Sequence, residues 1–182
     1  MLNQVVELKR DVSAVQIPSG DQLSLSEGDR VYITQILGGS YTVATDFGLA
    51  RISKENADAL GVDTSDSQTE EDNKINENAS LEEQVWDTLK CIYDPEIPVD
   101  IVNLGLIYDV TLILLENNLH HVAVKMTLTA PGCGMGPHLM MEAKERIEAL
   151  PGVEAADVEM VWDPPWNQEM VSEEGKMKLG LI

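Results

Sequence analysis

Positive charge is scarce in this sequence of 182 residues, because 12 Lys and Arg stand against 32 Asp and Glu, a formal net charge of -20. So acidic a chain repels phosphate backbones and anionic lipid surfaces. No apolar run reaches membrane-spanning length, and the first residues, with an acid at Glu7, lack the long apolar core of a signal peptide. We therefore expect a cytoplasmic protein that binds neither nucleic acid nor a membrane.

Cysteine is scarce too, with only Cys91 and Cys133 in the chain. In a reducing cytosol both are expected to be free thiols, and no Cys-x-x-Cys spacing marks them as a redox pair. Cys91 falls at the edge of the apolar face of a predicted helix, which favours a packed, structural thiol.

A polar segment divides the chain. Residues 62–80 contain six acids and one lysine and have no aromatic residue, which is typical of a disordered linker. The sequence therefore predicts a module at 1–61, an acidic linker at 62–80 and a second domain at 81–182. Since 43% of the residues are hydrophobic, buried cores are expected.

Residues 1–61 have the pattern of a small β-rich module. Apolar residues at 31–37 and 41–45 flank Gly38-Gly39, which predicts a hairpin, and a third strand is expected at 49–52. Ser53 is expected to cap a short helix that ends at Gly61. The module has no cysteine or histidine, so we expect a structural or docking role.

The second domain reads as helix, strand, strand, helix, strand. Ser80 and Glu83 have capping-box spacing before the first helix. Alternating apolar residues predict a hairpin of strands 106–114 and 122–128, and Pro137 suits the start of a second helix that ends near Leu150. A last strand is expected at 158–162. With both helices on one face of a small mixed sheet, the fold class is α/β (α+β), a two-layer sandwich after the β-rich module.

Cys133 is the main candidate for chemistry. It lies between Gly132 and Gly134, after a predicted strand and before a predicted helix start, where backbone N–H groups favour a thiolate and glycines leave the sulfur accessible. The alternative is a buried, inert small residue. His138, five residues later, is a candidate base for a hydrolase, although no orienting carboxylate or amide is evident.

An acidic loop follows the first helix. It carries Asp94, Glu96 and Asp100, stiffened by Pro95 and Pro98. These carboxylates would steer Cys133, bind a metal ion or carry protons, or else the loop only ends the helix in a solvated turn.

Two tryptophans follow the last strand. Trp162 and Trp166 flank Asp163-Pro164-Pro165 and serve either for packing or as a docking surface. In a compact sheet this segment would lie at the same end as the Cys133 loop.

Two segments resemble the iron-sulfur cluster assembly domain family. They are Asp-Pro-Glu-Ile-Pro-Val-Asp-Ile-Val-Asn-Leu-Gly-Leu-Ile-Tyr at 94–108 and Thr-Ala-Pro-Gly-Cys at 129–133. The resemblance implies a compact α/β domain that helps to mature iron-sulfur proteins, with Cys133 as the reactive cysteine and Asp94 opening the acidic loop. Glu96, Thr129, Gly132 and Gly134 would support the site.

The resemblance extends to the tail at 162–180 and to the β-rich N-terminal region. The chain also departs from the family pattern at several positions. Family members often have an amide where this chain has Asp100 and an acid where it has Asn103, and Gly175 interrupts a tail segment that is usually helical.

The number of cysteines limits what this role can be. A cubane or rhombic cluster normally takes four thiolates, so two cysteines cannot hold one permanently. Cys133 would be a transient cluster ligand, with other ligands from a second copy in a homodimer, a small thiol or a partner. We expect an accessory maturation factor without turnover that contacts scaffold or carrier proteins and apo client proteins. The alternatives are a thiol-dependent redox or hydrolytic enzyme and an inert binding adaptor.

Overall fold

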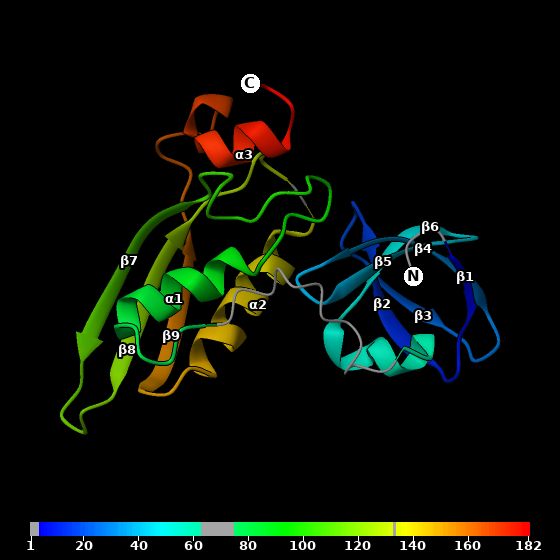
Figure 1. The fold of residues 1–182 in the computed structure, drawn as a ribbon, viewed down its shortest axis with the longest axis horizontal. Coiled ribbons are helices and arrows are strands. Elements are labelled where there is room, and N and C mark those ends of the chain that lie inside the picture. Colours follow the sequence, from blue (N-terminus) through cyan, green and yellow to red (C-terminus); the bar gives the residue numbers. More distant parts are fainter. Residues whose placement is uncertain (1–3, 63–74, 133) are drawn as a thin grey trace. The chain divides into compact units, whose positions relative to one another are not determined.

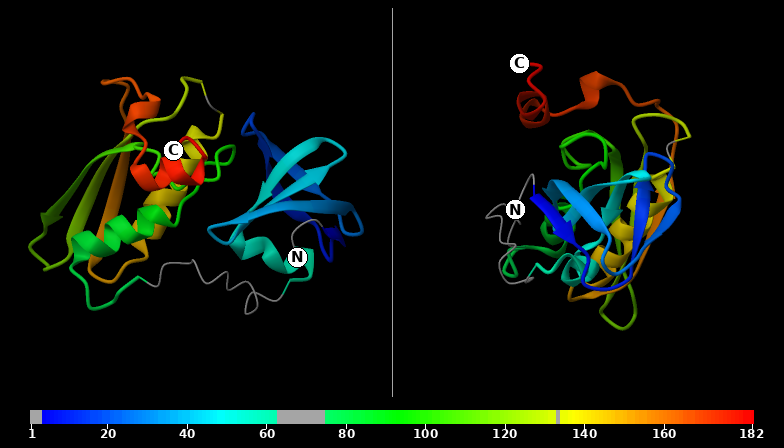
Figure 2. Two further views of the ribbon diagram at one scale, coloured as in Figure 1. Left: turned by 45° about the horizontal axis from the view of Figure 1, so that its top comes forward. Right: turned by 90° about the vertical axis from the view of Figure 1, so that its right-hand side faces the viewer.

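The computed structural model describes residues 4–62, 75–132 and 134–182. The chain divides into two compact units, Met1–Asp72 (unit 1) and Asn73–Ile182 (unit 2) (Figures 1 and 2). Most of the predicted linker lies outside the described residues. Its ends do not behave as linker, because Val62 is buried in the core of unit 1 and Ile75 packs against the core of unit 2.

Unit 1 is built on one antiparallel sheet with the strand order β1-β4-β5-β6-β2-β3. The strands are β1 (Gln4–Glu7), β2 (Val12–Ile17), β3 (Gln22–Leu25), β4 (Arg30–Leu37), β5 (Ser40–Thr45) and β6 (Gly48–Ile52). The predicted hairpin is confirmed, since β4 and β5 pair around Gly38-Gly39, whose φ angles of 57° and 80° suit glycine. The third strand, β6, is confirmed as well, whereas β1, β2 and β3 were not predicted.

The short helix of unit 1 differs from its prediction. It is a 3-10 helix, η1 (Lys54–Leu60), and Ser53 makes no side-chain capping bond. Gly61 ends it in the left-handed conformation, as expected. Arg10 Nε donates a 2.7 Å hydrogen bond to Asp58 in η1, which lowers the pKa of that carboxyl.

Unit 2 is a two-layer α/β sandwich, as predicted. The elements are α1 (Leu81–Lys90), β7 (Ile107–Leu114), β8 (His120–Met126), α2 (Gly136–Glu148), β9 (Val153–Met160), η2 (Gln168–Met170) and α3 (Glu173–Lys178). The sheet has the order β7-β8-β9, with β7 antiparallel and β9 parallel to β8. Helices α1 and α2 cover one face of it (Figure 1), and their buried residues Val85, Leu89, Leu139, Ala143 and Ile147 share a core with Val122, Val124 and Met126 of β8.

The last strand and the tail differ from the prediction. Strand β9 ends at Met160, so Trp162 lies beyond it and is exposed. Gly175 does not interrupt the tail, because it is buried inside α3. A Cβ at this position would lie 2.8 Å from Val171 Cγ1 and 2.9 Å from the carbonyl oxygen of Asn103, so the close contact of α3 with the loop requires glycine.

No helix in the described part of the chain is long and apolar enough to cross a membrane.

Two serines that precede helices should differ in their effect on stability. Ser80 completes a capping box, in which its Oγ accepts a hydrogen bond from Glu83 N–H at 3.3 Å and its own N–H donates to Glu83 Oε2 at 3.0 Å. Ser80→Ala should lower the free energy of unfolding of unit 2 by about 1 kcal/mol. Ser53→Ala is the matched control and should cost less, since Ser53 makes no capping bond and its Oγ only accepts a 3.1 Å hydrogen bond from the Asn56 side-chain amide. Urea denaturation measures both, and equal losses would contradict the assignment.

Candidate functional site

Three segments of unit 2 meet at one end of its sheet. Because β8 and β9 are parallel, the segments that leave them start at the same end, and Val161 N–H donates to Met126 O at 2.8 Å. Thr127 N–H donates to Leu106 O at 2.8 Å, which joins the acidic loop to the same place. The acidic loop, the segment that leads to Cys133 and the tail are thus neighbours. The tail includes residues 163–166, which were expected at this end of the sheet.

Asp94 holds the turn that opens the acidic loop. Its carboxylate is buried, and Oδ1 accepts hydrogen bonds from the backbone N–H groups of Glu96 at 2.9 Å and Ile97 at 3.0 Å. Glu96, in contrast, is exposed. The two carboxylates of this turn therefore have different surroundings, and only that of Asp94 shapes the backbone.

The rest of the loop is part of the core. Val99, Ile101 and Leu104 have no exposed surface, whereas Glu96 and Pro98 are exposed, so the loop is solvated only around these two residues. Asp100 is buried as well, and its carboxylate accepts hydrogen bonds from the backbone N–H of Asn103 at 2.9 Å and from its Nδ2 at 2.7 Å. Within the described residues, no three His, Cys, Asp or Glu side chains come together as a metal site.

Asn103 connects the loop to the tail. Ser172 Oγ–H donates to Asn103 Oδ1 at 2.6 Å, and Ser172 N–H donates to the carbonyl oxygen of Asn103 at 2.8 Å. Ser172 Oγ in turn accepts from Gly175 N–H at 3.0 Å and so caps α3. A continuous chain of hydrogen bonds thus runs from Gly175 through Ser172 and Asn103 to Asp100.

The tail makes further contacts beside this chain. Trp166 Nε1–H donates to Leu104 O at 2.7 Å, so this tryptophan packs, and Tyr108 O–H donates to Pro164 O at 2.6 Å. Gly105 has a φ of 75°, and a Cβ there would collide with the carbonyl group of Met170, 2.8 Å from its carbon. The tail backbone therefore approaches the loop as closely as a glycine allows.

Cys133 itself lies outside the described residues. Thr129 and Gly134 are half-buried and Gly132 is exposed, with a φ of 81° and open space where a Cβ would stand. In the sequence Cys133 comes two residues before Met135, the N-cap of α2, which makes no side-chain capping bond. Met135 is fully buried, so this thioether fills the interior.

Cys91 has the surroundings of a structural thiol. It is half-buried at the end of α1, and its Sγ–H donates to Asp87 O at 3.3 Å.

The sequence did not point to several residues of this site. Thr127 is fully buried, and its hydroxyl has no hydrogen-bond partner in the described structure. No sequence signal marks it. Ser172 did have a signal, because a serine followed by Glu173 and Glu174 is typical of a helix N-terminus.

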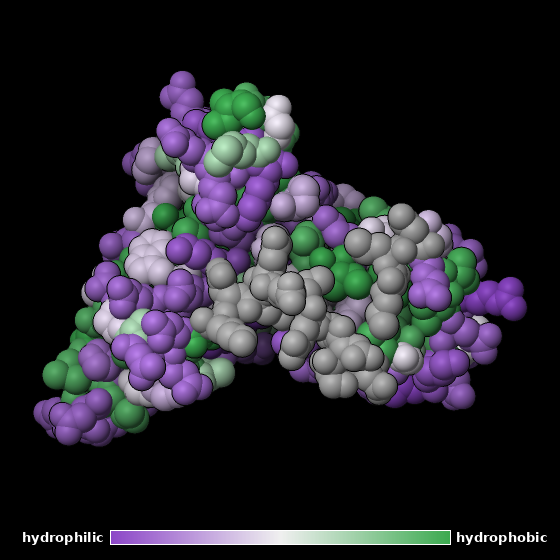
Figure 3. Space-filling view, in the orientation of Figure 1, coloured by the Kyte–Doolittle hydropathy of each residue, from purple (hydrophilic) through white to green (hydrophobic). Residues whose placement is uncertain are grey.

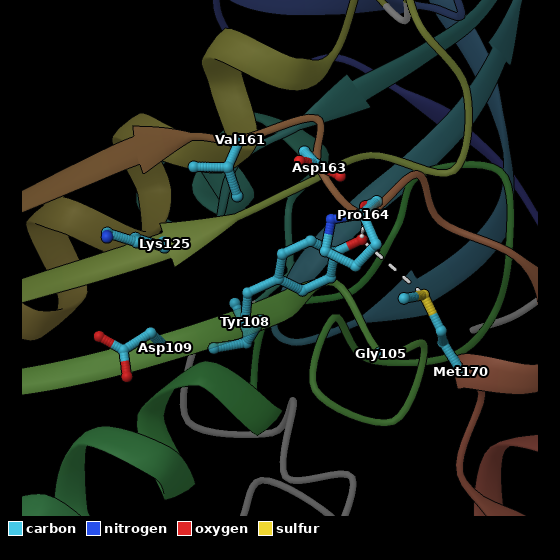
Figure 4. Close-up of a pocket in the computed structure, with 9 residues that line it drawn as sticks. Gly105, Tyr108, Asp109, Lys125, Val161, Asp163, Pro164 and Met170 are labelled. Atoms are coloured by element: carbon cyan, nitrogen blue, oxygen red, sulfur yellow. Dashed lines mark hydrogen bonds between the residues drawn. The ribbon is translucent and has the colours of Figure 1, made fainter.

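A pocket of about 680 Å³ opens between the start of β7, the end of β8 and the tail (Figure 4). Its wall combines apolar and charged side chains and includes Ile107, Tyr108, Asp109, Lys125, Asp163 and Met170. The Tyr108 ring lies beside Pro164 at its centre (Figure 4). Asp94, Glu96, Thr129, Gly132 and Gly134 do not line it.

Comparisons with known proteins give consistent matches. Residues 82–160 match a family model described as iron-sulfur cluster assembly protein. The Fe-S protein maturation auxiliary factor YitW of Bacillus subtilis is 41% identical over 102 residues, which make up 56% of this chain and 96% of that protein. SufT of Staphylococcus aureus, named in the same way, is 39% identical over 90 residues, or 50% of this chain and 98% of that protein. A crystal structure of the domain of unknown function DUF59 from Bacillus anthracis is 39% identical, covers 56% of this chain and 93% of that chain, and has a TM-score of 0.49.

The expected family resemblance is thereby confirmed for unit 2. It does not extend to the N-terminal region in YitW or SufT, because 102 and 90 residues already account for nearly all of these two relatives.

Gly105→Ala should detach the tail from the loop. The new Cβ would meet the carbonyl group of Met170 in addition to straining a positive φ, so we expect a loss of roughly 3 kcal/mol or more. Gly180→Ala is the matched control, since its φ of 69° carries the same strain with open space around it, and about 1 kcal/mol is expected. Urea denaturation and the Trp166 indole N–H signal in NMR report the two effects. Equal losses would mean that the close contact is unimportant.

The Asp100 and Asn103 pair allows an exchange test. Asp100→Asn would set two amide NH₂ groups against each other and should cost about 1–3 kcal/mol of unfolding free energy. Adding Asn103→Asp restores one donor and one acceptor and leaves a carboxylate to accept from Ser172, so stability should recover. If the double variant, measured by thermal unfolding, is no more stable than the single one, the pair does not act as described.

Proposed function

Because this chain belongs to the iron-sulfur cluster assembly protein family, we propose that it is an accessory factor for the maturation of iron-sulfur proteins in the cytoplasm. It assists cluster assembly or cluster transfer to apo client proteins. The observation that carries the proposal is the match at about 40% identity to nearly the full length of relatives named Fe-S protein maturation auxiliary factors. Its partners are scaffold or carrier proteins and apo clients, and it has no turnover reaction of its own.

Cys133 is the functional thiol in this proposal and a transient ligand of the cluster. A cluster needs about four thiolates, so the remaining ligands come from a second copy, a small thiol or the client. Incomplete ligation suits transfer, because an incoming client that offers a full set of cysteines binds the cluster more strongly than one sulfur does.

The surroundings of Cys133 along the chain support this role. Before it, Thr127 is held to Leu106 by a backbone hydrogen bond. After it, Gly136 packs so closely on Leu128 that a Cβ would lie 2.6 Å from Cδ1. Anchored flanks and small residues at 132 and 134 provide a short segment that a partner protein can approach.

Unit 1 has a docking role in the proposal. YitW and SufT are named as maturation factors, and their matches of 102 and 90 residues leave too few other residues for a counterpart of unit 1. In this proposal the shared function therefore belongs to unit 2. Residues 1–61 contain no histidine and no cysteine, so in this proposal the module adds a binding surface and no chemistry of its own.

Cells that depend on this protein test the role of the thiol. Cys133→Ser should abolish its support of client maturation, measured as the activity and iron content of an iron-sulfur enzyme. Cys91→Ser is the matched control and should support maturation normally, because Cys91 lies at the end of α1 and its thiol donates a hydrogen bond to the backbone carbonyl of Asp87. Normal maturation with Cys133→Ser, at equal protein levels, would refute the proposal.

Cluster ligation has a separate test. Anaerobic reconstitution with iron, sulfide and a small thiol should give the visible absorption of a cluster with the wild type, and little of it with Cys133→Ala. Equal absorption from both proteins would mean that Cys133 is not a ligand.

A further inference from the structure

Strand β7 ends the sheet of unit 2 and has a free edge. It is eight residues long, and among the described residues it pairs with β8 alone, at one end of the strand order β7-β8-β9. In two views of the ribbon, no described segment lies beyond it (Figures 1 and 2). A free edge presents unpaired backbone N–H and C=O groups, which an extended chain can pair with.

The side chains of β7 do not protect this edge. Ile113 is 48% exposed and Leu114 is 63% exposed. Since neighbouring residues of a strand point to opposite faces, apolar surface is exposed on both faces of the edge. Figure 3 shows apolar surface at the lower left, where β7 ends in Figure 1. Asp109 is the only charged residue in the strand.

The opposite edge of the sheet, strand β9, is protected against strand addition by charged side chains. Strand β9 has the same length and carries Glu154, Asp157 and Glu159, all exposed. Charged side chains along an edge discourage strand addition, because a paired chain would have to bury or approach them. The two edges of one sheet therefore differ, and β7 is the one open to pairing.

Charge decides between possible occupants. A second copy of this chain would bring another net charge of -20 to the edge, and like charges of this size oppose association. A cationic segment is attracted instead. A matching antiparallel partner would have apolar residues opposite 112–114. Because Asp109 lies four residues before Ile113, a basic residue opposite Asp109 would come four positions after the partner residue opposite Ile113.

We propose that the free edge of β7 binds an extended segment of a partner protein by antiparallel strand addition. The segment has an apolar stretch followed by a Lys or Arg. Main-chain hydrogen bonds supply affinity, and the exposed apolar side chains and Asp109 select the segment. The inference goes beyond the proposed function, because this binding needs neither Cys133 nor a cluster.

A synthetic peptide tests this edge on the full chain. The probe is fluorescein-labelled Lys-Ile-Val-Ile-Thr-Val-Lys-Lys, which has the predicted pattern, and its binding is measured by fluorescence anisotropy. Its matched control carries N-methyl groups on alternate backbone amides, which remove hydrogen-bond donors and keep charge and side chains. We expect the control to bind at least about tenfold more weakly, since several main-chain hydrogen bonds are lost.

Two variants locate the binding. Ile113→Lys should weaken peptide binding about tenfold or more by placing a charge on the edge. Val5→Lys, at a 60% exposed position of strand β1 in unit 1, makes the same charge change and should leave binding unchanged. Amide hydrogen exchange of the wild type should slow in β7 when the peptide is added.

Three results would overturn the proposal. Equal binding of the N-methylated peptide would mean charge attraction alone. Equal weakening by Ile113→Lys and Val5→Lys would place the binding elsewhere. A dimer of the chain alone in sedimentation, with slowed exchange in β7, would make a second copy the occupant.

Discussion

The partly buried hydrogen bonds that join Asp100, Asn103 and Ser172 are the contact on which the site of unit 2 depends. They tie the acidic loop to the tail, and they pair the buried Asp100 carboxylate, which would be costly to leave without a partner. Each group has a partner of the right kind, because the amide of Asn103 donates to a carboxylate and accepts from a hydroxyl. The loop and the tail therefore form as one structure, with glycine at 105 and 175 where their backbones touch.

These hydrogen bonds give the carboxylates of the acidic loop a structural role. The sequence leaves open whether these carboxylates steer Cys133, bind a metal ion, carry protons or only end the helix. In the structure, Asp94 and Asp100 accept hydrogen bonds from nearby backbone and amide N–H groups. Their carboxylates shape a partly buried loop that lies beside the segment leading to Cys133. In the proposed function the loop acts by holding its neighbours in place, and the sulfur provides the reactive group.

Much of the fold could be predicted from local patterns. The capping box at Ser80 and Glu83 and the alternation along β8 each depend on residues close in sequence, and both are confirmed. The short strands β1 and β3 were missed, because four residues of mixed polarity carry no clear period, and they form only by pairing with β4 and β2. Ser53 was wrongly expected to cap, since its position before a helix does not determine where its hydroxyl points.

From the sequence alone we could infer the acidic character of the chain, its β-rich and α/β parts, the family of its second unit and Cys133 as the residue to test. These follow from composition, short-range periodicity and motifs, which the order of residues contains directly. The folded chain was needed to show that Ser172 hydrogen-bonds to Asn103, 69 residues away, and that no other described strand pairs with the outer edge of β7. Such contacts depend on the path of the whole chain, because packing brings distant groups together and no local propensity specifies the pair.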